Sequence, residues 1–265
     1  MGMVRIGTSG YSFRSWKGTV YPPTIKESQM LSYYINEFKF NTVEINYTYY
    51  HQPSAKTMAS LAQKTPEGFD FTVKLFGGIT HEPFRSGIPE HVDTSLSAQF
   101  TEGIAPLKES GKLGCVLAQF PPGMPYTPKT WNYLLSLKES FHDVPLVFEF
   151  RNRAWASNET FERLREADIG FCAVDCPPLE SLMPLIPEVT SKIAYLRLHG
   201  RNPNWFKEPF RRYDYVYTTE ELEQLLGTIR EMASRSDKMY IAFNNCHAGA
   251  ALRNAKALQE MIDNQ

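Results

Sequence analysis

The feature that most constrains the fold of this chain is a regular alternation of short apolar segments with stretches of helical periodicity. Eight segments are rich in β-branched or aromatic residues and are typical of buried strands. They are VRIGTS at 4–9, TVEIN at 42–46, DFTVKL at 70–75, GCVLAQF at 114–120, PLVFEF at 145–150, GFCAVD at 170–175, IAYLRLHG at 193–200 and MYIAFNN at 239–245. Between several of them the apolar period changes to that of a helix, as at Leu222, Leu225, Leu226 and Ile229.

Repeated strand-helix units predict parallel strands joined by right-handed crossovers. Eight such units in 265 residues match the size of a closed barrel, so we expect an α/β fold made of a single TIM-type (β/α)8 barrel domain over residues 1–265. An open doubly wound sheet is the alternative, but GTSGYS at 7–12 lacks its glycine-rich phosphate turn. The proline-rich segment 176–192 predicts an irregular connection after strand six.

Charge and cysteine content exclude several classes of protein. Lys and Arg number 28 and Asp and Glu 29, so a net charge of -1 provides no overall field for nucleic acid or an anionic membrane. No apolar run approaches the roughly 18 residues that a membrane span needs. The cysteines lack the spacing of a metal finger or a disulfide framework, which favours reduced structural thiols and a cytoplasmic location. They are Cys115, Cys172, Cys176 and Cys246.

Polar side chains stand at the C-terminal ends of the predicted strands, where the active sites of such barrels lie. In IAYLRLHGRN at 193–202, Tyr195, Arg197 and His199 share one face of the strand, which we assign to the barrel lumen. So many polar groups converging on one cavity are costly unless a ligand binds there. The strand ends supply Ser9, Glu44, Asn46, Lys74, Gln119, Glu149, Arg151, Asp175, Arg197, His199, Asn244 and Asn245.

Each of these groups also has a purely structural interpretation, and those alternatives stay open. Glu149 with Arg151 fits a buried ion pair, and His199 fits a hydrogen-bonded core histidine. Asn244 and Asn245 fit a strand cap. Two aromatic loops, at 10–23 and 201–217, are expected over the barrel mouth, either to bind ligand or to pack on the rim.

Seven motifs carry a resemblance to a known family. They are GTSGYSFRSWKGTVYPP, NTVEINYTYY, FDFTVKLFGGITH, LAQFPP, VFEFRNRAW, YLRLHGRN and FNNCHAGAALRNA. Their order from about Val4 to Ile262 resembles the YecE-like family, also called domain of unknown function 72. The resemblance implies a TIM-type barrel but no activity. It marks as motif positions Glu44, Asn46, Lys74, His81, Gln119, Glu149, Arg151, Trp155, Asp175, Arg197, His199, Gly200, Asn244 and Asn245.

Two positions depart from the motifs of that family. Asn152 stands at a position where many relatives have a histidine, so an obligatory acid or base is not expected there. Cys246 follows the asparagine pair where other residues are common, which weakens any proposal of a reactive thiol.

The leading hypothesis is an enzyme that uses general acid-base chemistry on a small anionic or polyhydroxylated substrate, bearing a sugar or phosphate group, at an anion-binding pocket. A hydrolase, lyase or isomerase fits that chemistry, and no cofactor is expected. The catalytic candidates are Glu44, Lys74, Glu149, Asp175 and His199, with His199 moving a proton near neutral pH. The substrate-binding candidates are Asn46, Gln119, Arg151, Arg197, Asn244, Asn245, Trp16 and Tyr21. Glu149→Gln is expected to abolish turnover without unfolding the barrel.

Two alternative functions belong to other classes. One is a metal-dependent hydrolase or isomerase resembling xylose-isomerase-like or apurinic-endonuclease barrels, in which Glu149, Asp175 and His199 bind Mn, Mg or Zn. Against it, Arg151 and Arg197 would repel a cation. The other is a non-catalytic module that binds a nucleotide or nucleic acid through the basic aromatic loop 201–213.

Overall fold

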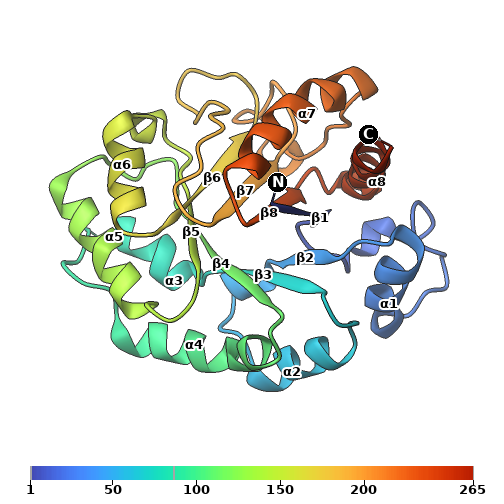
Figure 1. The fold of residues 1–265 in the computed structure, drawn as a ribbon, viewed down its shortest axis with the longest axis horizontal. Coiled ribbons are helices and arrows are strands. Elements are labelled where there is room, and N and C mark those ends of the chain that lie inside the picture. The colour runs from blue at the N-terminus through green and yellow to red at the C-terminus, as the bar shows by residue number, and fades with distance from the viewer. Residues whose placement is uncertain (1, 86, 265) are drawn as a thin grey trace.

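Eight parallel strands form one sheet in the spatial order β1-β8-β7-β6-β5-β4-β3-β2, in a computed structural model that describes residues 2–85 and 87–264. Figure 1 shows these strands at the centre, ringed by helices. Each strand lies within two residues of its predicted bounds, because apolar runs between turns were a reliable signal here. The strands are β1 Met3–Thr8, β2 Thr42–Ile45, β3 Asp70–Lys74, β4 Leu113–Gln119, β5 Leu146–Glu149, β6 Gly170–Asp175, β7 Ile193–Leu198 and β8 Lys238–Phe243.

Helices connect successive strands on the outside of the barrel, as the alternation predicted. They are α1 Glu27–Phe38, α2 Ala55–Gln63, α3 Gly77–Thr80, α4 Thr94–Glu109, α5 Pro128–Ser140, α6 Asn158–Glu166, α7 Thr219–Ser234 and α8 Ala250–Asp263. Both α3 and α4 follow β3, whereas β6 leads to β7 through residues 176–192 without a helix. The predicted single TIM-type barrel with an irregular connection after strand six is therefore confirmed.

The seam between β1 and β2 is closed by a side chain as well as by a short backbone contact. Ser9 and Glu44 form a single parallel bridge at the C-terminal end of the seam. Deeper in the seam, the hydroxyl of buried Tyr34 accepts a hydrogen bond from the Thr8 N–H (2.9 Å) and donates to the Thr42 carbonyl (3.0 Å). Tyr34 thus takes the place of a strand-to-strand hydrogen bond where the sheet would otherwise stay open.

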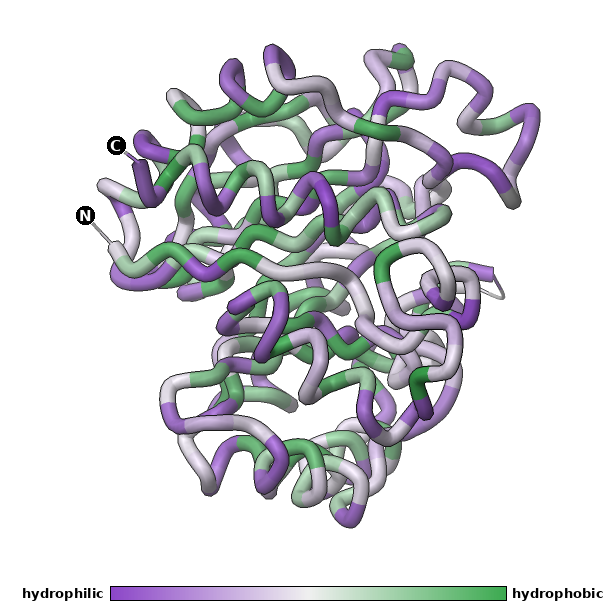
Figure 2. Tube along the Cα trace, turned by 90° about the vertical axis from the view of Figure 1, so that its right-hand side faces the viewer, coloured by the Kyte–Doolittle hydropathy of each residue, from purple (hydrophilic) through white to green (hydrophobic). Residues whose placement is uncertain are grey.

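The registers of the paired strands fix which side chains enter the lumen. Tyr195 and Arg197 of β7 align with Cys172 and Val174 of β6, and residues paired in this way point to the same side of a parallel sheet. Outward-facing residues meet the helices, and Figure 2 shows the hydrophobic stretches in the interior, with hydrophilic ones on the outer turns of helices. The lumen is therefore a packed polar column inside an apolar shell.

The N-terminal end of the lumen is filled by charges that the sequence analysis did not single out. The Asp70 carboxylate accepts hydrogen bonds from Lys238 Nζ and from the Tyr240 hydroxyl, both at 2.8 Å, and lies 3.5 Å from Arg5 Nε. Asp70 and Lys238 start β3 and β8, and Arg5 and Tyr240 are the third residues of β1 and β8, so all four lie in the first half of their strands, away from the predicted site. Paired charges at this end of such a barrel contribute to stability rather than to chemistry.

Two further observations concern the class of protein. The four cysteines are free thiols, two of them fully buried, as their spacing indicated. Within residues 2–85 and 87–264, no helix has the length and apolar character that crossing a bilayer requires.

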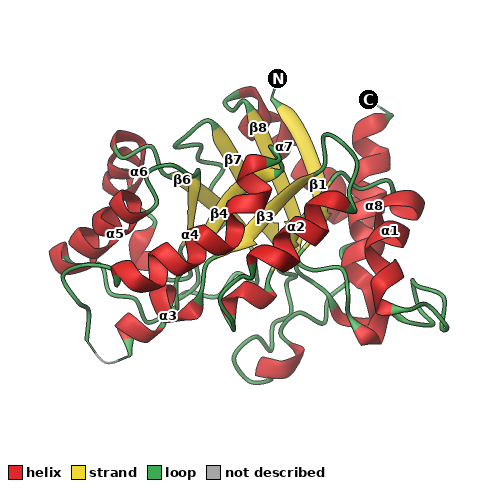
Figure 3. Cartoon of the chain, turned by 90° about the horizontal axis from the view of Figure 1, so that it is seen from below, coloured by secondary structure: helices red, strands yellow, loops and turns green. Residues whose placement is uncertain are grey.

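Figure 3 shows the strands running from the top to the bottom of the view, with the loops that follow them, and α3, gathered at the bottom. This lower edge is the C-terminal mouth of the barrel. The turn after β7 is made by Gly200, whose φ of +87° favours glycine and whose added Cβ would lie 2.5 Å from Tyr215 Cβ. The chain can therefore leave β7 sharply and enter the long loop over the mouth.

Tyr34→Phe should lower the free energy of unfolding by about 1–3 kcal/mol, because it leaves a buried N–H and a buried carbonyl unpaired at the seam. The measurement is urea denaturation followed by circular dichroism. Tyr33→Phe is the matched control, since its hydroxyl forms no hydrogen bond within the part of the chain that the structure describes. Equal stabilities of the two variants would contradict a bridging role for Tyr34.

Candidate active site

Arg197 occupies the centre of the lumen and joins strands on opposite walls. Its Nη1 donates to Glu149 Oε2 on β5 (2.5 Å), and its Nη2 donates to Glu44 Oε1 on β2 (2.6 Å). The side chain is 1% exposed. The Tyr195 hydroxyl donates to the other Glu44 oxygen at 2.8 Å. Arg197 is thus neutralised by two carboxylates, and its two terminal nitrogens are committed to the protein.

Glu149 is the carboxylate that links the interior to the mouth. Besides Arg197 it pairs with Arg151 Nε, and the His199 ring lies 3.2 Å from its Oε1. Burial acts to raise the pKa of Glu149, but Arg151 and Arg197 outweigh it and hold that pKa well below its ordinary value. We call Glu44, Glu149, Arg151, Arg197 and His199 the buried charge network.

His199 is held as a neutral imidazole by partners on both sides. The Asn244 amide donates to Nδ1 (3.0 Å), which leaves the proton on Nε2 to donate to Glu149. Burial, reinforced by Arg151, lowers the pKa of His199 to about 3. With both ring nitrogens occupied and a pKa this low, His199 does not fit the expected proton carrier near neutral pH. The structural alternative, a hydrogen-bonded core histidine, describes its surroundings better.

Lys74 is a basic residue of the mouth without a carboxylate partner within the described residues. It ends β3 and is partly exposed. Its Nζ donates to Gln119 Oε1 (2.9 Å) and lies 4.6 Å from the centre of the Tyr49 ring. Burial, together with nearby Arg197, lowers the pKa of Lys74 to about 7, although Glu149 and Glu44 act in the opposite direction. At neutral pH its amine is therefore balanced between the charged and free forms.

Two residues beside Lys74 were not among the predicted site residues. Tyr49 supports the Lys74 amine, and its ring also packs edge-on against His81 at 4.8 Å. His81 bonds through Nδ1 with the Thr80 hydroxyl, and burial followed by repulsion from Lys74 lowers its pKa to about 4. The resemblance marked His81, but nothing in the residues alone separated Tyr49 from its tyrosine-rich segment.

Asp175 lies outside this network, which corrects its assignment as an acid or base of the lumen. Because Arg197 aligns with Val174, Asp175 is one residue out of phase and faces the other side of β6. Its carboxylate binds Arg201 through Nε and Nη2 (3.0 and 2.7 Å) and accepts from the Tyr217 hydroxyl at 2.7 Å. Asp175 therefore anchors the loop after β7 rather than the site.

The three residues predicted as alternative metal ligands, Glu149, Asp175 and His199, are not brought together in the structure. Glu149 and His199 contact one another, but Asp175 is turned away to Arg201. Among residues 2–85 and 87–264, no three His, Cys, Asp or Glu side chains form a group that fits a metal ion. The two arginines on Glu149 would also repel a cation at that carboxylate.

The loop 201–213 folds back onto the mouth through its aromatic residues. Trp205 is buried, and its ring centre lies 6.2 Å from that of His199. The guanidinium groups of Arg151 and Arg212 both form cation–π contacts with the Trp205 ring, at 5.8 and 5.6 Å from its centre. Arg211 pairs instead with Asp214 at 2.9 Å. Because carboxylates or rings already engage these arginines, the loop offers less positive charge to a phosphate backbone than its composition suggests.

Three predicted substrate-binding residues are structural. Trp16 and Tyr21 are fully buried, where Trp16 donates to the Cys246 carbonyl (2.7 Å) and Tyr21 to the Tyr11 carbonyl (2.8 Å). Asn245 is buried and donates to Asn254 Oδ1 at 2.9 Å. These corrections share one cause, since an aromatic or amide group near a strand end packs inward as readily as it binds ligand.

The remaining predicted residues line the mouth or border it. Asn46 and Asn244 are partly exposed, and Gln119 is nearly buried, with its Nε2 donating to the Phe120 carbonyl at 2.6 Å. Ser9 is buried and accepts a long contact from Arg197 (3.4 Å). Asn152 caps a short turn by accepting from the Ala154 N–H (2.9 Å), which agrees with the absence of an acid or base at that position.

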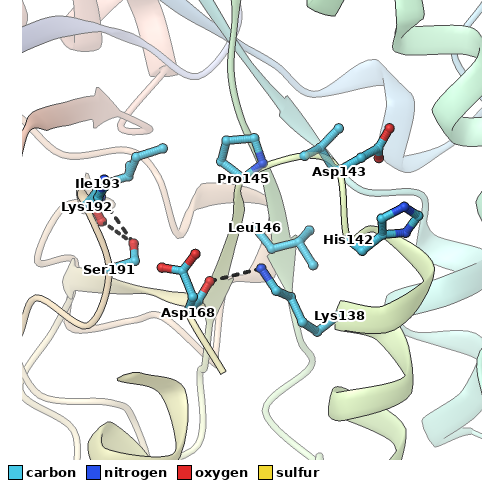
Figure 4. A pocket seen from close by; sticks show the side chains of 10 residues that line it. Lys138, His142, Asp143, Pro145, Leu146, Asp168, Ser191, Lys192 and Ile193 are labelled. Carbon is cyan, nitrogen blue, oxygen red and sulfur yellow. Dashed lines mark hydrogen bonds between the residues drawn. The ribbon is translucent and has the colours of Figure 1, made fainter. Parts of the chain in front are cut away.

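Pockets occur at both ends of the barrel. One of about 380 Å³ lies beside the C-terminal end of β6, between Arg153, Arg201 and the apolar residues of 177–185. Another of about 310 Å³ lies at the N-terminal ends of β5 to β7, where Lys138 donates to the Asp168 carbonyl (Figure 4). The second is a groove lined by loop backbone and flexible lysines, at the end of the barrel that usually serves stability.

Comparison with known proteins gives one consistent family. The model of the family described as "Protein of unknown function DUF72" matches residues 5–265. The UPF0759 protein YunF of Bacillus subtilis is 30% identical over 274 residues, covering 98% of this chain and 95% of that protein.

Solved structures agree with it. A DUF72 family protein from Thermotoga maritima is 42% identical with a TM-score of 0.91, covering 98% of this chain and 99% of that one. A DUF72 family protein from Enterococcus faecalis is 27% identical with a TM-score of 0.85, covering 98% and 96%. The resemblance found in the sequence is thereby confirmed.

Glu149→Gln should destabilise the barrel by about 3–5 kcal/mol, because it leaves Arg197 and Arg151 buried with one carboxylate fewer. The buried pairs of Glu149 make a loss of stability the expected result, whereas the sequence predicted a variant that stays folded. The matched control is Glu159→Gln, which breaks an exposed pair with Arg163 and should cost less than about 1 kcal/mol. Denaturant titration of both variants decides the matter, and similar losses would show that the buried network adds no stability.

Stability should also fall as the pH drops from about 6.5 toward 3. In that window the unfolded His199 binds a proton that the folded imidazole, with its pKa near 3, does not. His199→Gln should therefore flatten the pH dependence by up to about 1.4 kcal/mol per pH unit, measured as the free energy of unfolding between pH 7 and 4. The exposed His51→Gln is the control, and an unchanged slope in His199→Gln would contradict a neutral buried imidazole.

Proposed function

The chain belongs to the DUF72 family of proteins of unknown function, and we propose that this member is an enzyme using general acid-base chemistry at its barrel mouth. Its substrate is small and anionic or polyhydroxylated, such as a sugar acid or a phosphate ester. The reaction is a hydrolysis, an elimination or an isomerisation, which need proton transfer at a positioned group.

Lys74 carries the proposal. An acid-base catalyst works best when its pKa is close to the working pH, and the pKa of Lys74 is lowered to about 7. Lys74 is partly exposed, whereas the Glu44 and Glu149 carboxylates below it are buried and paired with arginines. Lys74 is thus our candidate for the group that takes up and returns a proton.

Arg151 supplies the anion site of the proposal. Within the described residues it uses Nε for Glu149 and forms no hydrogen bond through its terminal nitrogens. These nitrogens suit a carboxylate or a phosphate. The sequence favoured Arg197 for this role. Its terminal nitrogens already pair with Glu44 and Glu149, so we assign it as a positioning residue.

The other polar groups of the mouth orient Lys74, Arg151 and the substrate. Gln119 fixes the Lys74 amine, and Asn46 and Asn244, both partly exposed, suit substrate hydroxyls. Glu44 and Glu149 remain in the proposal as the carboxylates that hold Arg151 and Arg197 in place, and neutral His199 contacts Glu149. We do not propose metal-dependent chemistry, because the candidate metal ligands are not grouped within the described residues. We also do not favour nucleic-acid binding, because arginines of the loop 201–213 already contact a carboxylate or a ring.

We also propose a cytoplasmic location. Four free thiols are compatible with a reducing compartment, because none of them forms a disulfide. A small-molecule substrate is the expected partner.

The test is a screen in D2O, in which short hydroxyaldehydes, hydroxy acids and their phosphate esters are incubated with the protein and followed by NMR. We expect at least one compound to exchange a C–H for deuterium or to be converted. Lys74→Met should lower that rate by at least about 100-fold. Arg151→Gln should weaken anionic substrates by about 10-fold or more and leave neutral ones unchanged.

Lys129→Met is the matched control, because Lys129 is exposed on α5 and is not one of the proposed site residues. Thermal denaturation of each variant separates loss of activity from loss of fold. Full activity of a folded Lys74→Met variant would contradict the proposal.

A further inference from the structure

Lys74 differs from the neighbouring arginines in being held by neutral groups. Within the described residues, its Nζ contacts the Gln119 amide oxygen at 2.9 Å and the Tyr49 ring at 4.6 Å, and no carboxylate pairs with it. The Gln119 amide is itself fixed, because its Nε2 donates to the Phe120 carbonyl at 2.6 Å. The amide oxygen is thereby turned toward the amine, and one N–H of Lys74 is held in a defined direction.

Burial disfavours the ammonium form of Lys74, and nearby Arg197 acts in the same direction. Cationic Arg197 on β7 and Arg151 beyond β5 face it, while Glu149 and Glu44 are shared with those arginines. From the loop after β3, His81 contributes a neutral imidazole. Arginines beside a partly buried lysine are a known means of freeing an amine for nucleophilic attack.

We propose that Lys74 is a covalent nucleophile that forms an imine with an aldehyde or ketone carrying a carboxylate or phosphate. This inference rests on the proposed function, because it uses the same mouth and the same anion contact at Arg151. It adds the substrate class, a carbonyl compound, and narrows the reaction to a lyase or isomerase that acts next to that carbonyl.

The step is balanced without any further reactant. The nitrogen lone pair attacks the carbonyl carbon, and the former carbonyl oxygen takes up a proton and leaves as water after a second protonation. The nitrogen loses both of its amine protons in reaching the neutral imine, so the net products are imine and one water. Protonation of the imine then draws electrons from the adjacent carbon, which allows a C–H or C–C bond there to break.

Lys74 is positioned for this chemistry in a way that other lysines are not. Lys112 donates to the Ala62 and Thr65 carbonyls (both 2.6 Å), which engages its amine, and Lys238 pairs with Asp70 (2.8 Å). Lys129 is exposed on α5 and lies outside the proposed site. Selective reaction at Lys74 is therefore a measurable consequence.

The experiment treats the full chain at pH 7 with glyoxylate, an aldehyde bearing a carboxylate, and sodium cyanoborohydride, which reduces an imine to a stable amine. Peptide mapping by mass spectrometry then gives the modification rate of each lysine. We expect Lys74 to react at least about 10-fold faster than Lys129, because about half of its amine is unprotonated at this pH. Its rate should reach half of its maximum near pH 7.

Lys74→Arg should remove the fast site, and Lys129→Arg should leave it unchanged. The comparison within the wild-type protein does not depend on either variant folding, so a Lys74 rate no higher than that of Lys129 overturns the inference. Acetaldehyde, which lacks an anion, separates the two proposals. If acetaldehyde reacts with Lys74 as fast as glyoxylate does, imine formation is supported and the anion site at Arg151 is contradicted. If deuterium exchange depends on Lys74 but no reduced imine is found on Lys74, acid-base catalysis is supported and imine formation is contradicted.

Discussion

The ion pairs of Arg197 with Glu44 and Glu149 are the interaction on which the rest of the lumen depends. They connect β7 with β2 and β5 across the barrel, at 1% exposure, so their charges are removed from water almost completely. Burial of this kind is tolerated only when each charge is paired and hydrogen-bonded. Tyr195 supplies the additional bond to Glu44, and Arg151 supplies the second cation for Glu149. The buried carboxylates and arginines therefore balance one another within the protein.

This balance determines which groups remain available. Two carboxylates and two arginines satisfy one another, and His199 is locked between Glu149 and Asn244 as a neutral ring. The lysine at the end of β3 has no paired carboxylate within the described residues, and burial, together with nearby Arg197, lowers its pKa to about 7. The pairing that occupies the glutamates thus leaves Lys74 as the group that we propose for acid-base chemistry.

The sequence was sufficient for the barrel because two periodicities, of strands and of helices, are set by local geometry and by burial. It also identified most lumen charges, since alternation places Arg197 and His199 on one face. It failed where a single residue changes the face, as at Asp175, which is one position beyond Val174 in β6. It could not tell that Trp16 and Tyr21 pack inward, because burial of an aromatic side chain depends on distant elements.

The order of residues along the chain does not show which charged side chains pair with one another. In this barrel that pairing determines which charged groups are left available to a ligand. Arg151 and Arg197 are two of the same residue type on two strand ends, yet Arg197 is enclosed by two glutamates while Arg151 keeps its terminal nitrogens unbonded within the described residues. Partners 48 and 153 positions away in sequence make that difference. The division of labour that we propose between a structural and a ligand-binding arginine is consequently a property of the closed barrel, because only closure brings β2, β5 and β7 to a common centre.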